Sequence, residues 1–103
     1  MFDELLDPVV VSEADGTIIY VNARVCETTA RNRDQLIGHN LWSVYPASPD
    51  DPLFATFNRV ASMQQPEHIE RRSALTGRWY GSHLYMHRGR VVIVTHDITQ
   101  ERL

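Results

Sequence analysis

The sequence predicts an α+β domain in which a β-hairpin comes first, several helices follow, and three antiparallel strands end the chain. Two observations support this prediction. Segments rich in β-branched residues stand near both ends of the 103-residue chain, and helix-capping residues lie between these segments. A chain of this length forms one hydrophobic core, so we expect a single domain over residues 1–103.

The opening hairpin is predicted from two β-branched segments, 8–12 and 17–21, which are joined by an Asp-Gly turn. Glycine accepts the positive φ that a tight turn requires. Asn22 follows directly, and its side-chain oxygen can accept a free backbone N–H at the start of a helix over 23–30. The chain therefore passes from hairpin to helix without a linker.

Three further helical segments occupy the middle of the sequence. Residues 33–37 followed by Gly38 predict a single turn that ends at a left-handed glycine. Asn40 can cap another short turn. Asp51 can cap a longer helix that has proline at its first position and that Pro66 closes.

The last third of the sequence carries three strand segments separated by two short turns that contain glycine. They span residues 67–75, 78–87 and 90–96. If each turn has two residues, Arg71 faces Ser82 across the first hairpin, and Tyr85 faces Val92 across the second. The pairing of the strands can therefore be tested residue by residue.

Side chains alternate along strands, so these residues sort onto two faces. We expect one face and the helices to enclose either a solid core or an apolar ligand pocket. The residues concerned are Leu41, Val44, Phe57, Val60, Ile69, Arg71, Tyr80, Leu84, Ile93 and Thr95. The opposite face carries Trp79, His83, Tyr85, Val92 and Val94. That face is too apolar for water, so we expect an N-terminal helix that begins in residues 1–7, or a second copy of the chain, to cover it.

Arg71 falls on the face that is predicted to be inner, where an unpaired charge is costly. A ligand carboxylate would pair with its guanidinium. Alternatively an internal acid such as Glu27 or Glu70 pairs with it, or the side chain extends to water. We prefer the internal answer to the ligand.

The order and spacing of these segments resemble the PAS family over nearly the whole chain. The segments that carry the resemblance are Asp7–Val11, Asp15–Asn22, Gln35–Gly38, Asn40–Trp42, Gly77–Tyr80 and Asp97–Arg102. The resemblance implies a five-stranded antiparallel sheet with helices packed on one face. It also implies that Asp97, Ile98 and Thr99 form a signal exit, where residues 97–103 begin a helix that leads to an output domain.

The function implied by the resemblance is that of a cytoplasmic sensory module in signal transduction. Such a module binds a small apolar or carboxylate ligand, or a partner, and relays the change to a downstream effector domain in the same polypeptide. A histidine kinase of a two-component system or a cyclic-di-GMP enzyme such as a diguanylate cyclase is the expected effector. The alternative is a ligand-free dimerisation module with a solid core, and we expect a homodimer.

Two cofactors that the family uses lack their ligands in this sequence. A flavin photosensor of the family carries a reactive cysteine where this chain has Leu41, so a flavin–cysteine adduct is disfavoured. A haem-binding member supplies an axial histidine from the long helix, but residues 51–65 contain none. Cys26 lies among small side chains on an earlier helix, which indicates a packing role. The identity of any cofactor stays open.

A metal site is not expected from the spacing of the histidines. His83 and His87 lie about 13 Å apart along one strand, which is too far for both to bind one ion. His96 would face Gly81, with no acidic or thiol side chain in register. We therefore expect histidines that lie at the surface or contact helices.

Composition argues against several function classes. Ten basic and thirteen acidic residues give a net charge of −3, and the one basic cluster, Arg71-Arg72, is too short for a nucleic-acid surface. The apolar runs are far shorter than the roughly 20 residues that cross a bilayer, so we expect no membrane contact. A single cysteine and an N-terminus without a secretory signal favour the cytoplasm. The sequence contains no phosphate-binding loop, nucleophile elbow or metalloprotease motif, so we expect that the chain is not an enzyme.

Overall fold

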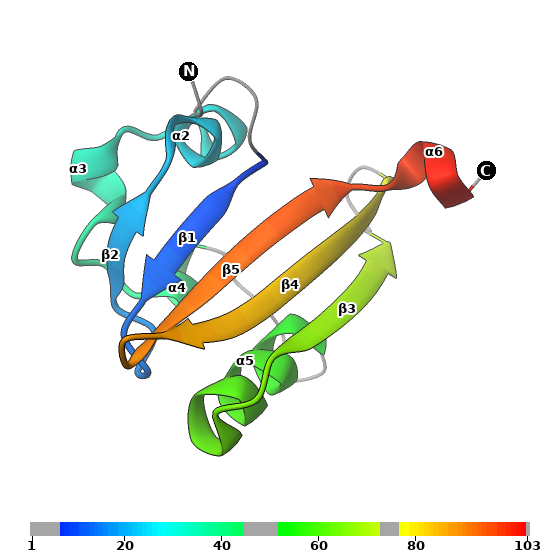
Figure 1. Cartoon of the computed structure of the whole chain (residues 1–103). Coiled ribbons are helices and arrows are strands. Elements are labelled where there is room, and N and C mark those ends of the chain that lie inside the picture. The colour runs from blue at the N-terminus through cyan, green and yellow to red at the C-terminus, as the bar shows by residue number, and fades with distance from the viewer. Residues whose placement is uncertain (1–6, 45–51, 73–76, 103) are drawn as a thin grey trace.

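The computed structural model describes residues 7–44, 52–72 and 77–102 (Figure 1). Within these residues a five-stranded antiparallel sheet has the order β2-β1-β5-β4-β3. The strands are β1 (Val9–Ser12), β2 (Ile18–Val21), β3 (Glu67–Arg72), β4 (Trp79–His87) and β5 (Arg90–Asp97). The helices are α2 (Ala23–Thr29), α3 (Arg33–Leu36), α4 (Leu41–Val44), α5 (Pro52–Met63) and α6 (Thr99–Arg102).

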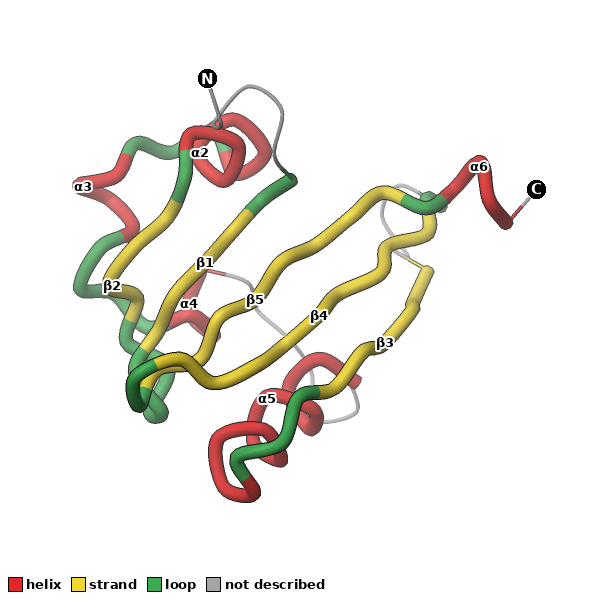
Figure 2. The backbone as a smooth tube through the Cα atoms, in the orientation of Figure 1, coloured by secondary structure: helices red, strands yellow, loops and turns green. Residues whose placement is uncertain are grey.

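The arrangement of the elements confirms the predicted fold class. Helix α5 packs against β3, β4 and β5, while α2 and α3 lie against the other half of the sheet, at β1 and β2. Figure 2 shows α6 leaving the end of β5 and lying beyond the sheet. None of the described helices is both long and apolar enough to span a membrane.

Asn22 joins the opening hairpin to the first helix, as predicted. Its side chain is buried, and Oδ1 accepts the N–H of Val25 at 3.2 Å and the N–H of Val9 at 3.2 Å. Its amide nitrogen donates to the carbonyl of Asp7 at 2.9 Å. The Asn22 side chain therefore caps α2 and also holds the backbone at the start of β1. Helix α2 ends one residue earlier than predicted, because Ala30 takes the left-handed conformation.

The short helices α3 and α4 begin at asparagine caps. The cap at Asn40 is confirmed, since its Oδ1 accepts the N–H of Trp42 at 2.9 Å. Helix α3 has a capping box that we did not predict: Asn32 accepts the N–H of Gln35, and the Gln35 side chain accepts the N–H of Asn32. Gly38 has the expected positive φ, although the helix itself ends at Leu36.

Helix α5 begins with Pro52 at its first position, as predicted, and ends at Met63 because Gln64 adopts a left-handed φ of 58°. The helix thus stops before Pro66 is reached. The predicted cap, Asp51, lies outside the described residues. So do residues 1–6, where we expected a flanking helix to begin.

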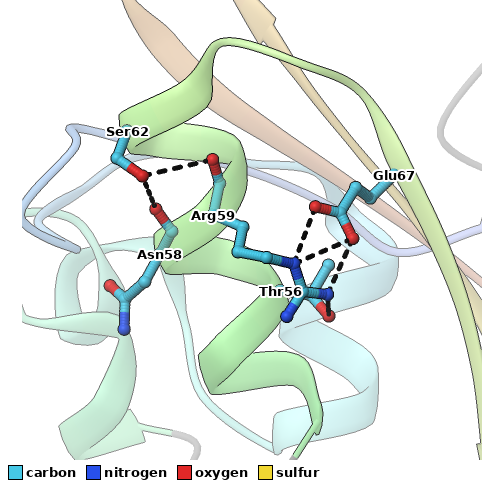
Figure 3. Close-up of polar contacts among 5 residues, drawn as sticks. All are labelled: Thr56, Asn58, Arg59, Ser62 and Glu67. Atoms are coloured by element: carbon cyan, nitrogen blue, oxygen red, sulfur yellow. Dashed lines mark hydrogen bonds and ion pairs between the residues drawn. The ribbon is translucent and has the colours of Figure 1, made fainter.

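A two-pronged ion pair connects α5 to the start of β3 (Figure 3). Arg59 Nε lies 2.9 Å from one Glu67 carboxylate oxygen, and Nη2 lies 2.7 Å from the other. The same Nη2 donates to the hydroxyl of Thr56 at 3.2 Å. The hydrogen bonds from Arg59 lower the pKa of Glu67. This contact fixes the edge strand β3 against the helix that covers it.

The second C-terminal hairpin has the predicted register. Tyr85 pairs with Val92, and the connecting residues Arg88 and Gly89 both have positive φ, at 52° and 79°. Positive φ at both central residues defines the type I′ turn, whose twist matches that of the strands it joins. Strand β5 extends one residue further than predicted, to Asp97.

The first C-terminal hairpin differs from the prediction. Arg71 pairs with Tyr80, not Ser82, and Arg72 with Trp79 is the last pair of the described ladder. Strand β3 spans Glu67–Arg72, and the predicted strand residues 73–75 and the predicted turn residue Thr76 lie outside the described residues. The register moves by two residues, which is one full side-chain period, so every residue keeps its predicted face.

The hydrophobic core lies between the sheet and the helices. Its members are Val10, Ile18, Val21, Val25, Leu36, Leu41, Leu53, Phe57, Val60, Leu84, Val91 and Ile93. Phe57 meets Trp42 edge to face, with ring centroids 5.3 Å apart. Cys26 packs against this cluster, as the sequence indicated. Burying each of the larger side chains contributes about 1.5–3 kcal/mol, so the core stabilises the sheet and helices as one unit.

Candidate ligand site and signal exit

The apolar part of the predicted ligand pocket is packed core. Five of its residues belong to the core cluster, and two more pack against that cluster: Leu41, Phe57, Val60, Leu84, Ile93, and then Val44 and Ile69. Their side chains contact one another in the described structure. The structure brings these seven residues together, and the expectation that they enclose a ligand stays a prediction.

The polar part of the predicted pocket lies on the same sheet face. Arg71 pairs with Tyr80, and Thr95 pairs with Ser82, a residue of the same face that we did not assign to the pocket. The hydroxyls of Ser82 and Thr95 hydrogen-bond each other at 2.9 Å, and Ser82 is fully buried. Hydroxyl and guanidinium groups therefore adjoin the apolar core on this face.

Arg71 is the unusual residue of this group. It is half-buried, and its Nε is completely buried without a hydrogen-bond partner among the described residues. A buried donor that lacks an acceptor costs about 1–3 kcal/mol. The position of Arg71 therefore favours an acceptor group beside it.

Neither acid that we named as an internal partner pairs with Arg71. Glu27 binds Arg24 within α2, with Oε2 3.3 Å from Nη1. Glu70 lies on the other face of β3, where its Oε2 is 3.2 Å from His68 Nε2. Successive strand residues point to opposite faces, so Glu70 cannot reach its neighbour's guanidinium. The preferred internal pairing was therefore wrong for both named acids.

The three residues of the predicted signal exit come together where β5 passes into α6. Asp97 Oδ2 lies 2.5 Å from Arg78 Nε, and Oδ1 accepts the N–H of Thr99 at 3.0 Å and its hydroxyl at 2.7 Å. The Thr99 hydroxyl oxygen in turn accepts the N–H of Trp79 at 2.9 Å. Ile98 donates its N–H to the Trp79 carbonyl at 2.9 Å. The start of α6 is thus fastened to the start of β4.

This hydrogen-bond network changes the pKa values of two charged side chains at the exit, Asp97 and Arg78. Hydrogen bonds from Arg78 and then from Thr99 lower the pKa of Asp97 from 3.8 to about 2. The Asp97 carboxylate in turn raises the pKa of Arg78. Both side chains are largely exposed, so solvent screens the ion pair, and the network matters for geometry more than for stability.

Ile98 turns back onto the outer face of the sheet, over Gly81. Ile98 is buried, and a Cβ placed on Gly81 would lie 3.6 Å from Ile98 Cγ2 and 3.3 Å from His68 Cε1. A side chain at position 81 would therefore crowd both neighbours. The exit contacts this outer face as well as the polar network.

The outer face is only partly shielded in the described chain. Tyr85 is 41% exposed and His83 is exposed, whereas Val92 is 7% exposed. Trp79 and Val94 are half-buried. Apolar surface therefore remains open around Tyr85, and the expectation that a helix or a second copy covers this face stays a prediction.

Three histidines gather on the outer face, an arrangement that the sequence reasoning missed. His68 and His83 are paired across β3 and β4, with Nδ1 atoms 3.3 Å apart, and the rings of His83 and His96 have centroids 5.5 Å apart. The expected register placed Glu70 opposite His83. The correct register would have revealed the pair. Burial lowers the pKa of His83, and positive charge on His68 and His96 lowers it further.

His96 has an acidic partner, contrary to our expectation. Its Nδ1 hydrogen-bonds Asp7 Oδ2. Asp7 directly precedes the segment that pairs with β5, where Val9 lies opposite Val94. The earlier argument considered only the three C-terminal strands, whereas this contact comes from the N-terminal strand. Within the part of the chain that the structure describes, no group of three or more His, Cys, Asp or Glu is arranged to hold a metal ion.

Comparison with known families identifies the class of protein. The chain belongs to the PAS family, since the family model described as PAS fold matches residues 2–103. Members of this family are generally sensory, non-catalytic modules. No curated protein sequence matches the chain.

Solved structures from sensory proteins share the fold. A sensory box sensor histidine kinase from Vibrio cholerae has a TM-score of 0.77 at 15% identity, over 95% of this chain and 86% of that one. The photoactive yellow protein domain from the sensor histidine kinase Ppr of Rhodospirillum centenum has a TM-score of 0.75 at 19% identity, over 93% and 89%. The PAS domain of the quorum-sensing receptor RpfR from Cronobacter turicensis, solved in complex with BDSF, has a TM-score of 0.73 at 18% identity, over 90% and 94%. These likenesses confirm the fold.

Proposed function

We propose that this chain is the ligand-binding sensory module of a signalling protein, with Arg71 as the residue that recognises the ligand. The observation that carries the proposal is the buried Nε of Arg71, which has no acceptor in the described structure. A bound carboxylate would supply that acceptor through a charge-assisted hydrogen bond, and such bonds are stronger than hydrogen bonds between neutral groups. The RpfR domain, a structural neighbour, was solved with a small molecule bound, and this supports ligand binding as a use of the fold.

The expected ligand is a small carboxylate with an apolar body. Its head group would meet Arg71, and the Ser82–Thr95 hydroxyl pair lies further along the same face. Its body would lie against apolar side chains such as Ile69, which packs at the margin of the core. Small-molecule sites usually have a mostly apolar lining with a small number of polar groups that orient the ligand.

The proposed relay runs across the sheet from Arg71 to the exit. Tyr80 pairs with Arg71 on one side and with Asp97 on the other, so these three residues form one row across β3, β4 and β5. A ligand that binds one arrangement of this row more tightly than another would shift the population of the two arrangements. Helix α6, which begins at Thr99, would then change its angle and pass the shift to an output domain in the same polypeptide. We propose a histidine kinase or a cyclic-di-GMP enzyme as that output, and the cytoplasm as the location.

Thermal denaturation with a matched pair of probes tests the ligand proposal. Octanoate and octanamide have the same body and differ in charge at the head. Octanoate should raise the melting temperature, since a ligand at 100 times its Kd stabilises by about 2.7 kcal/mol, and octanamide should raise it far less. Arg71→Gln should abolish the octanoate shift, while Arg72→Gln, on the opposite face, should retain it.

Three results would contradict ligand recognition by Arg71. They are equal shifts with octanoate and octanamide, an octanoate shift that survives in Arg71→Gln, and the absence of any shift together with no small molecule in native mass spectra of the purified domain. The last of these would favour the second candidate function.

The second candidate is a dimerisation module without a ligand. The packed apolar core and the open surface around Tyr85 favour it. In this case the outer face would form the interface of a homodimer. Trp79→Asp and Tyr85→Asp should each convert a dimer to a monomer in light scattering, and Met63→Asp, at an exposed site on α5, should not. Tyr85→Asp is the cleaner variant, because the backbone of Trp79 also holds the exit. An unchanged mass in Tyr85→Asp would remove this face from the proposal.

A further inference from the structure

We propose that His68 and His83 form a binding site for a divalent transition-metal ion, such as Zn²⁺, on the outer face of the sheet. The two residues are directly opposite in the β3–β4 ladder, and their Nδ1 atoms are 3.3 Å apart. Zinc binds histidine nitrogen at about 2.0–2.1 Å, so two nitrogens on one tetrahedral ion lie roughly 3.3–3.4 Å apart. The two nitrogens therefore already have the separation of two ligands on one ion, and because the ring centroids lie 4.2 Å apart at an interplanar angle of 46°, both rings must turn for their lone pairs to meet at that ion.

A carboxylate on the far side of the His68 ring favours the metal-binding form of that histidine. Glu70 Oε2 lies 3.2 Å from His68 Nε2. Since the carboxylate accepts, Nε2 carries the proton and Nδ1 presents a lone pair. A carboxylate that accepts from the second nitrogen of a ligating histidine is the usual support of such ligands. With His68 protonated at Nε2, a hydrogen bond between the two Nδ1 atoms requires the proton on His83 Nδ1, and metal binding would move that proton, through solvent, to His83 Nε2.

A shallow hollow beside the pair gives the ion room for its remaining ligands. It has a volume of about 260 Å³ and is lined by Pro66, Glu67, His68, His83, Leu84 and Tyr85. No third protein ligand converges on the pair among the described residues, so water would complete the coordination. His96 stands aside from the site, because its Nδ1 is held by Asp7.

Metal binding would connect the edge strand β3 to β4 on the face opposite Arg71. His68 also lies beside Gly81, next to the exit residue Ile98. The site thus adjoins the exit from the side that the proposed ligand does not occupy. It does not rest on the proposed ligand function.

Calorimetric titration of the tag-free protein with ZnCl₂ in a non-chelating buffer at pH 7.5 tests this site. The wild type should bind one ion in the micromolar range. His68→Gln and His83→Gln should each weaken binding at least tenfold, and Glu70→Gln should weaken it about 10–100-fold through loss of support. The control His87→Gln, on the same strand and the same face but at its far end, should leave the affinity unchanged.

A second measurement guards against variants that fail to fold. Melting temperatures recorded with EDTA and with Zn²⁺ should differ for the wild type and for His87→Gln, and should coincide for His68→Gln and His83→Gln. The proposal is overturned if the wild type binds no Zn²⁺ at millimolar concentration. It is equally overturned if folded His68→Gln and His83→Gln bind as the wild type does, or if His87→Gln loses as much affinity as they do.

Discussion

The two faces of the central sheet differ sharply, although alternate residues of the same strands build them. On the inner face Leu84 is fully buried against α5 and the core. Its neighbour on the outer face, Tyr85, is 41% exposed. The inner face thus supplies most of the stability, whereas the outer face keeps polar and aromatic groups accessible. The one buried side-chain polar atom of the described inner face that has no hydrogen-bond partner, Arg71 Nε, is for this reason the best indication of function there.

The comparison of the two faces predicts that substitution of a core residue causes the largest loss of stability. Leu84→Ala should destabilise the domain by about 2–5 kcal/mol, because it removes a fully buried side chain and leaves a cavity. Tyr85→Ala, one residue further and on the other face, should cost about 1 kcal/mol at most. Urea denaturation of both variants measures the difference. Equal losses would mean that the outer face is as well covered as the inner one.

A smaller effect is expected at the exit, where both faces meet. Thr99→Val keeps the shape of the side chain and removes the acceptor for the Trp79 N–H and the donor to Asp97. The cost should be about 1–2 kcal/mol, and amide exchange at Trp79 should become faster. Thr28→Val is the control, since the Thr28 hydroxyl donates to a carbonyl within its own helix. Unaltered exchange at Trp79 in Thr99→Val would mean that the hydroxyl does not hold α6.

The smallest predicted effect is on the stability of the folded domain in acid. The folded pKa of Asp97, about 2, lies below the ordinary value of 3.8. A depressed folded pKa stabilises the folded state at pH values above the ordinary pKa, and this contribution is lost as the pH falls from about 4 to about 2. Carboxyl resonances in NMR should show Asp97 titrating near 2, and Asp97→Asn should be less sensitive to acid than the wild type in this window. A midpoint near 3.8 would contradict the exit network.

Local patterns allowed most of the fold to be predicted. The caps at Asn22 and Asn40, the turn before β5 and the sorting of β4 residues onto two faces each depend on a few adjacent residues, and the structure confirms them. The predicted β3–β4 register was wrong by two residues, because it was counted from a two-residue turn at Thr76-Gly77, whereas Arg71 pairs with Tyr80 in the structure. Turn chemistry indicates where a chain reverses, but it does not by itself fix the register of the two strands.

The candidate site was harder to predict, because its contacts join residues far apart in the sequence. The sequence placed Arg71 on the inner face but could not show that both Glu27 and Glu70 have other partners. It also could not show that Asp7 contacts His96, which lies 89 residues further along the chain. The family resemblance indicated Asp97, Ile98 and Thr99 as the signal exit, and the polar network that joins them to Arg78 and Trp79 emerges only from the structure.

The most direct test of the central claim observes Arg71 itself. The Nε–H signal of Arg71, assigned by comparison with Arg71→Gln, can be followed by ¹⁵N-resolved NMR while octanoate is added. A ligand-sensing module should show a downfield shift of this signal, because the carboxylate accepts the hydrogen bond, together with shifts of the Trp79 and Thr99 amides at the exit. An Arg71 signal that does not move at saturating octanoate, or one that moves without any change at the exit, would contradict the account.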